Sequence, residues 1–117
     1  MITGLSSSIS ALFAFGKKMA VTANNVANLQ SEGFKRSRTL LEEGSQGGVA
    51  AQVETVNTPG VTLTEEGEQG TVERELSNVD LENEIPESIL TERGYQANLK
   101  TIETEEEMLG YLLDRKG

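Results

Sequence analysis

The sequence predicts a mainly α-helical protein, in which long N- and C-terminal helices pair in a coiled-coil-like bundle with a small β-hairpin insert between them. Two observations lead to this prediction. Apolar residues recur at alternating spacings of three and four near both ends of the chain, which is the pattern of a helical seam. The middle is rich in Gly, Thr and Val, which is typical of short strands and turns. The chain therefore divides into residues 1–33, 34–79 and 80–117.

The first helix is predicted over residues 5–29. Phe13, Ala20 and Ala27 form a second apolar row beside its main seam. Gly16 and Ala23 are small members of the main seam, so a neighbouring helix can approach closely there. The main seam comprises Ile2, Leu5, Ile9, Leu12, Gly16, Met19, Ala23 and Val26.

A cluster of asparagines marks the end of this helix. Asn24, Asn25 and Asn28 are poor interior helix formers. Near a helix end, however, Asn bonds well to backbone groups or across an interface. Gly33 then supplies the backbone freedom that a helix exit needs.

The middle of the chain is predicted to form one or two β-hairpins. Valines alternate with Thr, Gln and Glu, and glycines separate the runs. We expect strands near residues 34–41, 49–56, 61–65 and 71–76. The Asn-Thr-Pro-Gly run at residues 57–60 predicts a turn.

The second helix is predicted from Asp80 to about Asp114. Asp80 is an expected N-cap, and acidic residues follow it in the first turn. Pro86 should kink the helix or mark a late start, and Gly94 weakens it further. The apolar stripe of this helix includes Leu81, Ile85, Tyr95, Leu99, Ile102, Leu109 and Leu113.

Composition excludes several kinds of function. The chain has no Cys and no His, which removes disulfides, the common zinc sites and a histidine base. We therefore expect no enzyme activity, no cofactor, no metal and no small-molecule substrate. The basic run Lys35, Arg36 and Arg38 favours a solvated strand edge over a nucleic-acid site, because the net charge is −9. Glu103 and Glu105–Glu107 indicate a solvated helix face rather than a site for a divalent cation.

The charge is unevenly distributed along the chain. Residues 1–41 carry five basic side chains against Glu32, a sum of +4, so the remainder carries −13 of the total of −9. Ends of opposite sign attract each other, within one molecule or between molecules. The N-terminus lacks the pattern of a signal peptide, so any export is expected to proceed without a cleaved signal.

Several motifs occur in the two terminal regions. The first is A-N-N-V-A-N-L-Q-S-E-G-F-K-R at residues 23–36. The others are S-N-V-D-L-E-N-E at 77–84, Y-Q-A-N-L-K-T-I at 95–102 and E-M-L-G at 107–110. These motifs resemble those of flagellar rod, hook and hook-associated proteins. The residues that carry the resemblance are Asn24, Asn25, Asn28, Gly33, Asn78, Asp80, Gln96 and Asn98.

The resemblance implies a structural subunit of the flagellar basal-body rod, of the short, proximal-rod type. Such proteins are exported through the flagellar type III apparatus and stack helically into an axial rod that crosses the periplasm. The implied partners are copies of the chain and other axial rod and hook proteins. The expected assembly interface comprises Ile2, Leu5, Ile9, Leu12, Met19, Val26, Ile85, Tyr95, Leu99, Ile102, Leu109 and Leu113.

An alternative from another class stays open. A small coiled-coil adaptor that binds one partner helix, and never polymerises, would also need apolar seams at both ends.

Overall fold

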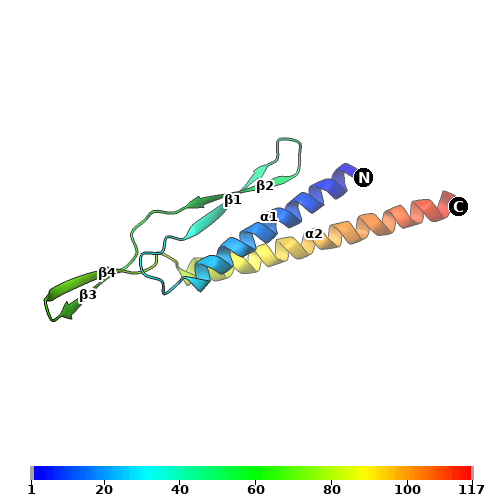
Figure 1. The fold of residues 1–117 in the computed structure, drawn as a ribbon. Coiled ribbons are helices and arrows are strands. Elements are labelled where there is room, and N and C mark those ends of the chain that lie inside the picture. The colour runs from blue at the N-terminus through cyan, green and yellow to red at the C-terminus, as the bar shows by residue number, and fades with distance from the viewer. Residues whose placement is uncertain (1, 117) are drawn as a thin grey trace.

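The computed structural model describes residues 2–116 and the side chains of residues 4–115. Two helices, α1 (Ile2–Ala27) and α2 (Leu81–Lys116), lie antiparallel, side by side (Figure 1). The described part of the molecule is elongated and measures 83 × 25 × 16 Å. Four strands form the insert between the helices: β1 (Ser37–Glu43), β2 (Val49–Thr55), β3 (Thr62–Gly67) and β4 (Gly70–Glu75). The predicted fold class, two long terminal helices with a small β insert, is confirmed.

The insert consists of two separate antiparallel hairpins. In the first, Ser37 lies opposite Thr55, and in the second Thr62 lies opposite Glu75. The turn predicted at residues 57–60 was wrong, because this segment is an irregular link between the hairpins. The side chain of Asn78 fixes the link by donating hydrogen bonds to the carbonyls of Val56 and Thr58, at 2.8 and 2.9 Å.

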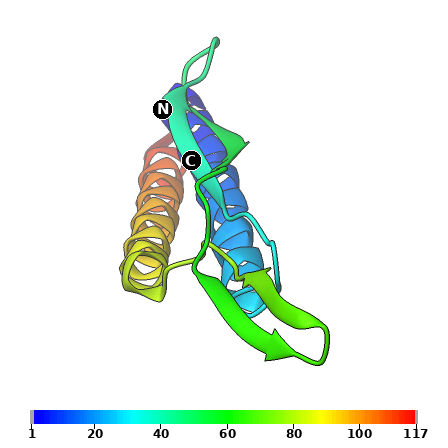
Figure 2. The same ribbon diagram turned by 90° about the vertical axis from the view of Figure 1, so that its left-hand side faces the viewer.

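Helix α1 is the central element, since it contacts α2 on one side and the β1–β2 hairpin on another (Figure 2). The backbone N–H of Val49 donates to Ser10 Oγ at 3.0 Å, and the Lys17 ammonium donates to the carbonyl of Ala51 at 3.2 Å. These bonds attach strand β2 along the length of α1. A third side of α1 is left without a covering element among the described residues.

The β3–β4 hairpin projects beyond the helix pair, at the end opposite the chain termini (Figure 1). It makes no contact with the other helices and strands of the described chain, and all of its side chains are exposed. Its base is fastened by an ion pair between Lys35 and Glu75 and by the Gly60 N–H, which donates to Glu75 at 3.0 Å. The hydrogen bonds from Lys35 and Gly60 hold the pKa of Glu75 below its ordinary value.

The α1–α2 pair is the most extensive contact between elements of the described chain. Phe15 of α1 packs over Gly94 of α2, where an added Cβ would lie 2.8 Å from the ring. Gly94 therefore favours the packing of the two helices despite its low helix propensity, because only glycine lets the Phe15 ring come this close to α2. The buried residues of the two helices are mostly polar, namely Ser8, Ala11, Ala14, Thr22, Asn25, Glu84 and Thr91.

The start of α2 follows the predicted cap. Asp80 accepts a hydrogen bond from the N–H of Glu82 at 3.0 Å and one from the side chain of Asn83 at 2.9 Å. Of the two effects predicted for Pro86, a kink or a late start, the late start does not occur, because α2 begins at Leu81 and continues through Pro86. Proline removes one hydrogen bond to the carbonyl of Glu82. Both residues are exposed, so water can satisfy that carbonyl.

Candidate protein–protein interface

The predicted seams lie mostly on the outside of the helix pair. On α1, Leu5, Leu12 and Met19 are half-buried, whereas Ile9 and Val26 are exposed. On α2 only Ile102 is half-buried, and the other predicted interface residues are exposed, namely Ile85, Tyr95, Leu99, Leu109 and Leu113. The side chain of Ile2 lies outside the described part. The exposed members, which include all the predicted α2 residues except Ile102, are therefore available to a partner.

An apolar groove runs along the uncovered side of α1. One hollow, of about 370 Å³, is lined by Ile9, Leu12, Phe13, Gly16, Lys17 and Tyr95. A second, of about 430 Å³, is lined by Gly16, Met19, Ala20, Ala23, Glu92 and Tyr95. Because the hollows share Gly16 and Tyr95, we treat them as one surface and call it the open groove. Phe13 stands at its edge and is 75% exposed.

Helix α2 continues past the start of α1. The two helices meet at Gly4 and Glu105, where a Cβ on Gly4 would lie 2.8 Å from a Glu105 carboxylate oxygen. Residues 106–115 extend further and are all exposed; we call them the overhang (Figure 1). Its large apolar side chains are Met108, Leu109, Tyr111, Leu112 and Leu113.

Asn25 joins three elements at the opposite end of the helix pair. It is 1% exposed, and its Nδ2 donates to the Ser37 carbonyl at 2.7 Å and to Glu84 Oε1 at 3.2 Å. Its Oδ1 accepts the Ser37 N–H at 2.9 Å. This one side chain therefore connects α1, β1 and α2, which explains its place in the sequence motif.

Asn78 has a similar function where the hairpins leave the helices. Its Oδ1 accepts the backbone N–H of Arg36 at 2.6 Å, while its Nδ2 holds the link between the hairpins. Gly33 has the positive φ expected of a helix exit, +67°, and its N–H donates to the Glu75 carbonyl at 2.9 Å. The sequence singled out both residues, but it did not reveal these partners.

The remaining motif residues make local contacts only. Asn28 donates to the carbonyl of Asn24 at 2.8 Å, one helical turn earlier. Asn98 donates in the same way to the carbonyl of Gly94 at 2.8 Å, and Gln96 donates to Glu92 at 3.3 Å.

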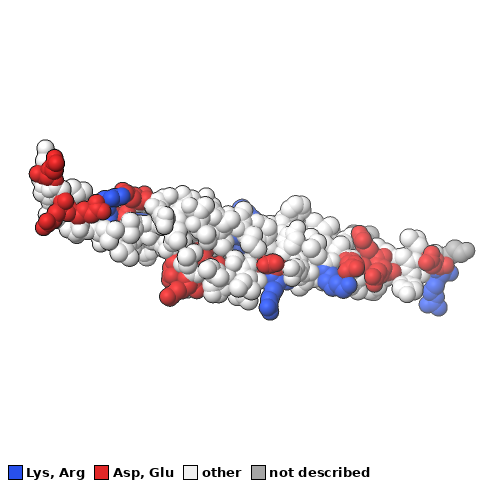
Figure 3. Space-filling model, turned by 90° about the horizontal axis from the view of Figure 1, so that it is seen from below, with Lys and Arg blue, Asp and Glu red and all other residues white. Residues whose placement is uncertain are grey.

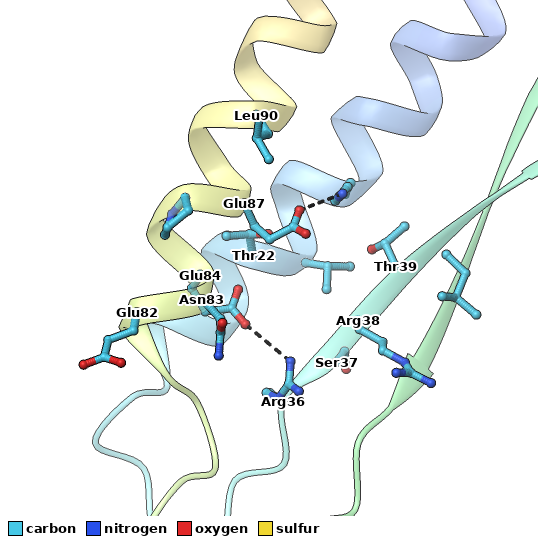
Figure 4. A pocket seen from close by; sticks show the side chains of 14 residues that line it. Thr22, Arg36, Ser37, Arg38, Thr39, Glu82, Asn83, Glu84, Glu87 and Leu90 are labelled. Carbon is cyan, nitrogen blue, oxygen red and sulfur yellow. Dashed lines mark ion pairs between the residues drawn. The ribbon is translucent and has the colours of Figure 1, made fainter.

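A second groove, of about 470 Å³, lies at the junction of α1, β1 and α2 (Figure 4). Its charged groups face one another in pairs: Lys18 lies 2.8 Å from Glu87, and Arg36 lies 4.0 Å from the buried Glu84. Arg38, on the same strand, pairs with Glu54. Because these pairs neutralise each other, the junction groove offers no net charge to a ligand.

The remaining surface was compared with what a charged-ligand site, a metal site or a membrane span would need. Acidic side chains gather on the β3–β4 hairpin, and further acidic and basic groups lie along the length of the face that Figure 3 shows. Among the described residues, no three His, Cys, Asp or Glu side chains are placed to hold a metal ion. Within residues 2–116, neither helix combines the length and apolar character needed to cross a membrane.

Comparison with known proteins matches both terminal regions to family models. Residues 5–35 match the family described as flagella basal body rod protein, and residues 68–115 match the flagellar basal body rod FlgEFG protein C-terminal family. Together these matches include most of α1, all of β4 and nearly all of α2, and they exclude the β1–β2 hairpin and strand β3.

Two curated proteins show the same relationship. The chain is 48% identical over 42 residues to the flagellar basal-body rod protein FlgG of Bacillus subtilis (strain 168), covering 36% of this chain and 16% of that protein. It is 45% identical over 42 residues to the flagellar hook protein FlgE of Treponema pallidum (strain Nichols), covering 36% of this chain and 9% of that protein. The similarity thus spans only a small part of the length of either relative.

Proposed function

The chain belongs to the flagellar basal-body rod family, and from this premise we propose that it is a rod subunit that assembles helically with its own copies through its terminal helices. The family consists of structural components of the flagellum, not of enzymes. Family membership supports a location in the flagellar basal body. That the chain is exported by the flagellar type III apparatus, without a cleaved signal, is part of the proposal.

The observation that carries the proposal is the apolar surface left open on both helices. The open groove and the overhang together expose aliphatic and aromatic side chains, among them Phe13, Tyr95 and Leu113. Full burial of one Leu, Ile or Phe side chain stabilises an interface by about 1.5–3 kcal/mol. Burial of these faces against neighbouring subunits is therefore the main favourable contribution to the free energy of assembly.

Charge has a smaller part in this proposal. The basic residues of the N-terminal region are mostly paired within the chain, as Lys18 with Glu87 and Arg38 with Glu54. Exposed ion pairs contribute about 0–1 kcal/mol each and are screened by salt. We therefore propose that apolar contacts between the helices of neighbouring subunits, rather than ion pairs, stabilise the assembly. The proposed axial partners are other rod and hook proteins, since a rod protein and a hook protein each resemble part of this chain.

The adaptor alternative uses the same groove differently. The open groove is long enough to bind one helix of another protein, and such a complex would bury the apolar surface without forming a polymer. The two functions differ in what the purified chain does alone.

Electron microscopy and sedimentation of the purified, concentrated chain separate these functions. A rod subunit should form elongated particles whose mass grows with protein concentration, because each added copy buries apolar surface. An adaptor should stay monomeric at every concentration. Persistent monomers, in a sample whose circular dichroism spectrum shows the helices formed, would contradict the rod assignment.

A further inference from the structure

Two apolar surfaces of this chain lie at different places and have different shapes. The open groove is concave and lies between the middle of α1 and Tyr95 of α2. The overhang is a convex, single-helix segment beyond Glu105. Helix α1 begins at Ile2, close to its contact with Glu105, so most of the overhang extends past α1 and away from the groove.

We propose that the overhang of one copy docks into the open groove of the next copy. This inference rests on the proposed function and names the contact that would join successive subunits. The contact is heterologous, because a surface on one copy meets a different surface on its neighbour. Heterologous contacts that do not close into a ring build open helical filaments.

The dimensions of the two surfaces agree. The overhang has ten residues, 106–115, and extends about 15 Å as an α-helix. The groove residues from Ile9 to Ala23 span about 21 Å of α1. A helix with apolar side chains on one side fits a groove of this kind by inserting anchors one turn apart. Leu109 and Leu113 have that spacing and are 38% and 71% exposed.

The small residues of the groove give room for these anchors. A Cβ added to Gly16 would meet no atom within 4 Å, so the space above Gly16 is open. Ala20 and Ala23 are exposed beside it and present only methyl groups. Leucine side chains entering this space would gain contacts with Met19 and Tyr95, which line the same hollow.

A second copy is the occupant that the chain itself supplies, because the overhang is an exposed apolar segment short enough for the groove. Lys17 lies at the rim of the groove and donates to the Ala51 carbonyl, but it forms no ion pair among the described residues. Glu92 lines the same groove, so the two rim charges balance. The overhang carries Glu106, Glu107 and Asp114 against Arg115, a sum of −2, so a docked overhang can place a carboxylate near Lys17.

The test uses two full-length variants that each lose one surface. Ala20→Glu places a charge in the groove and leaves the overhang intact, whereas Leu113→Glu places a charge on the overhang and leaves the groove intact. Both sites are exposed, so each variant should keep the native circular dichroism spectrum. Each variant alone should sediment as a monomer. An equimolar mixture should form a 1:1 dimer that grows no further, because one intact groove meets one intact overhang.

Matched substitutions control for the added charge. Ala97→Glu alters an exposed alanine of α2 outside the groove, and Leu90→Glu alters a leucine that is 65% exposed in the junction groove. Both should assemble like the native chain. Lys17→Glu gives an independent variant: it should weaken association a few-fold at low salt, and less at high salt.

The results separate this inference from the function on which it rests. A mixture that stays monomeric, while the native chain polymerises, would overturn the docking of overhang in groove and leave the rod function standing. Self-association of either variant alone would overturn it too, because the contact would then join like surfaces. A native chain that never associates would overturn both.

Discussion

Leu99→Glu should abolish assembly and leave the folded chain intact. Leu99 is 45% exposed on α2, and it is not one of the residues buried between the helices. Adding a carboxylate there costs the monomer little, because the group stays in water. In an assembly the same carboxylate would be buried among apolar side chains without a partner, which is strongly unfavourable. Polymer content should fall below detection by sedimentation at concentrations where the native chain is fully assembled.

Leu90→Glu is the matched control for this substitution. It introduces the same group on the same helix, but in the junction groove rather than on the predicted seam. The control should assemble normally, and both variants should retain native helical content. Native assembly of the Leu99→Glu chain would show that the α2 seam is not part of the interface. Leu12→Glu is expected to act in the same way from α1, although Leu12 is half-buried and its replacement also affects the monomer.

Asn25→Ala should cause the largest loss of stability of any exchange of an asparagine in the motif. Asn25 is almost fully buried, and its amide satisfies both backbone groups of Ser37 and one oxygen of Glu84. Alanine would leave these groups buried without partners. A buried group deprived of its partner costs about 1–3 kcal/mol, so we expect a loss of about 2–3 kcal/mol in the free energy of unfolding.

Chemical denaturation followed by circular dichroism measures this loss, with Asn24→Ala as its control. Asn24 is the neighbouring residue of the same motif, but it is exposed, so its replacement should change stability by no more than about 0.5 kcal/mol. Equal effects of the two substitutions would show that the junction of α1, β1 and α2 does not depend on the Asn25 amide.

Several elements were predictable because their signals are local. The strand boundaries follow the alternation of valines, and the observed strands lie within a few residues of those expected. Asp80, followed by acidic residues, indicated the start of α2, and its capping hydrogen bond bears this out. Gly33 was expected at a helix exit and has the left-handed backbone that glycine favours.

The internal contact between the helices was not predictable in this way. A search for recurring apolar residues selects the hydrophobic faces, and in this chain much of those faces is exposed. The most deeply buried positions of the helices include Thr22, Asn25 and Thr91, which such a search passes over. Its close approach at Gly94 depends on Phe15, far away in the sequence, so glycine appeared there only as a weak point of the helix.

The most direct test of the account compares hydrogen exchange in the dilute and the assembled chain. The central claim is that neighbouring subunits cover the faces that one subunit leaves open. Amides of the overhang, residues 106–115, should exchange rapidly in dilute solution, because no tertiary contact supports that segment. The same amides should become strongly protected in the assembled protein, along with those around the open groove. Protection gained only in the two hairpins, with the overhang still exchanging rapidly, would contradict the account.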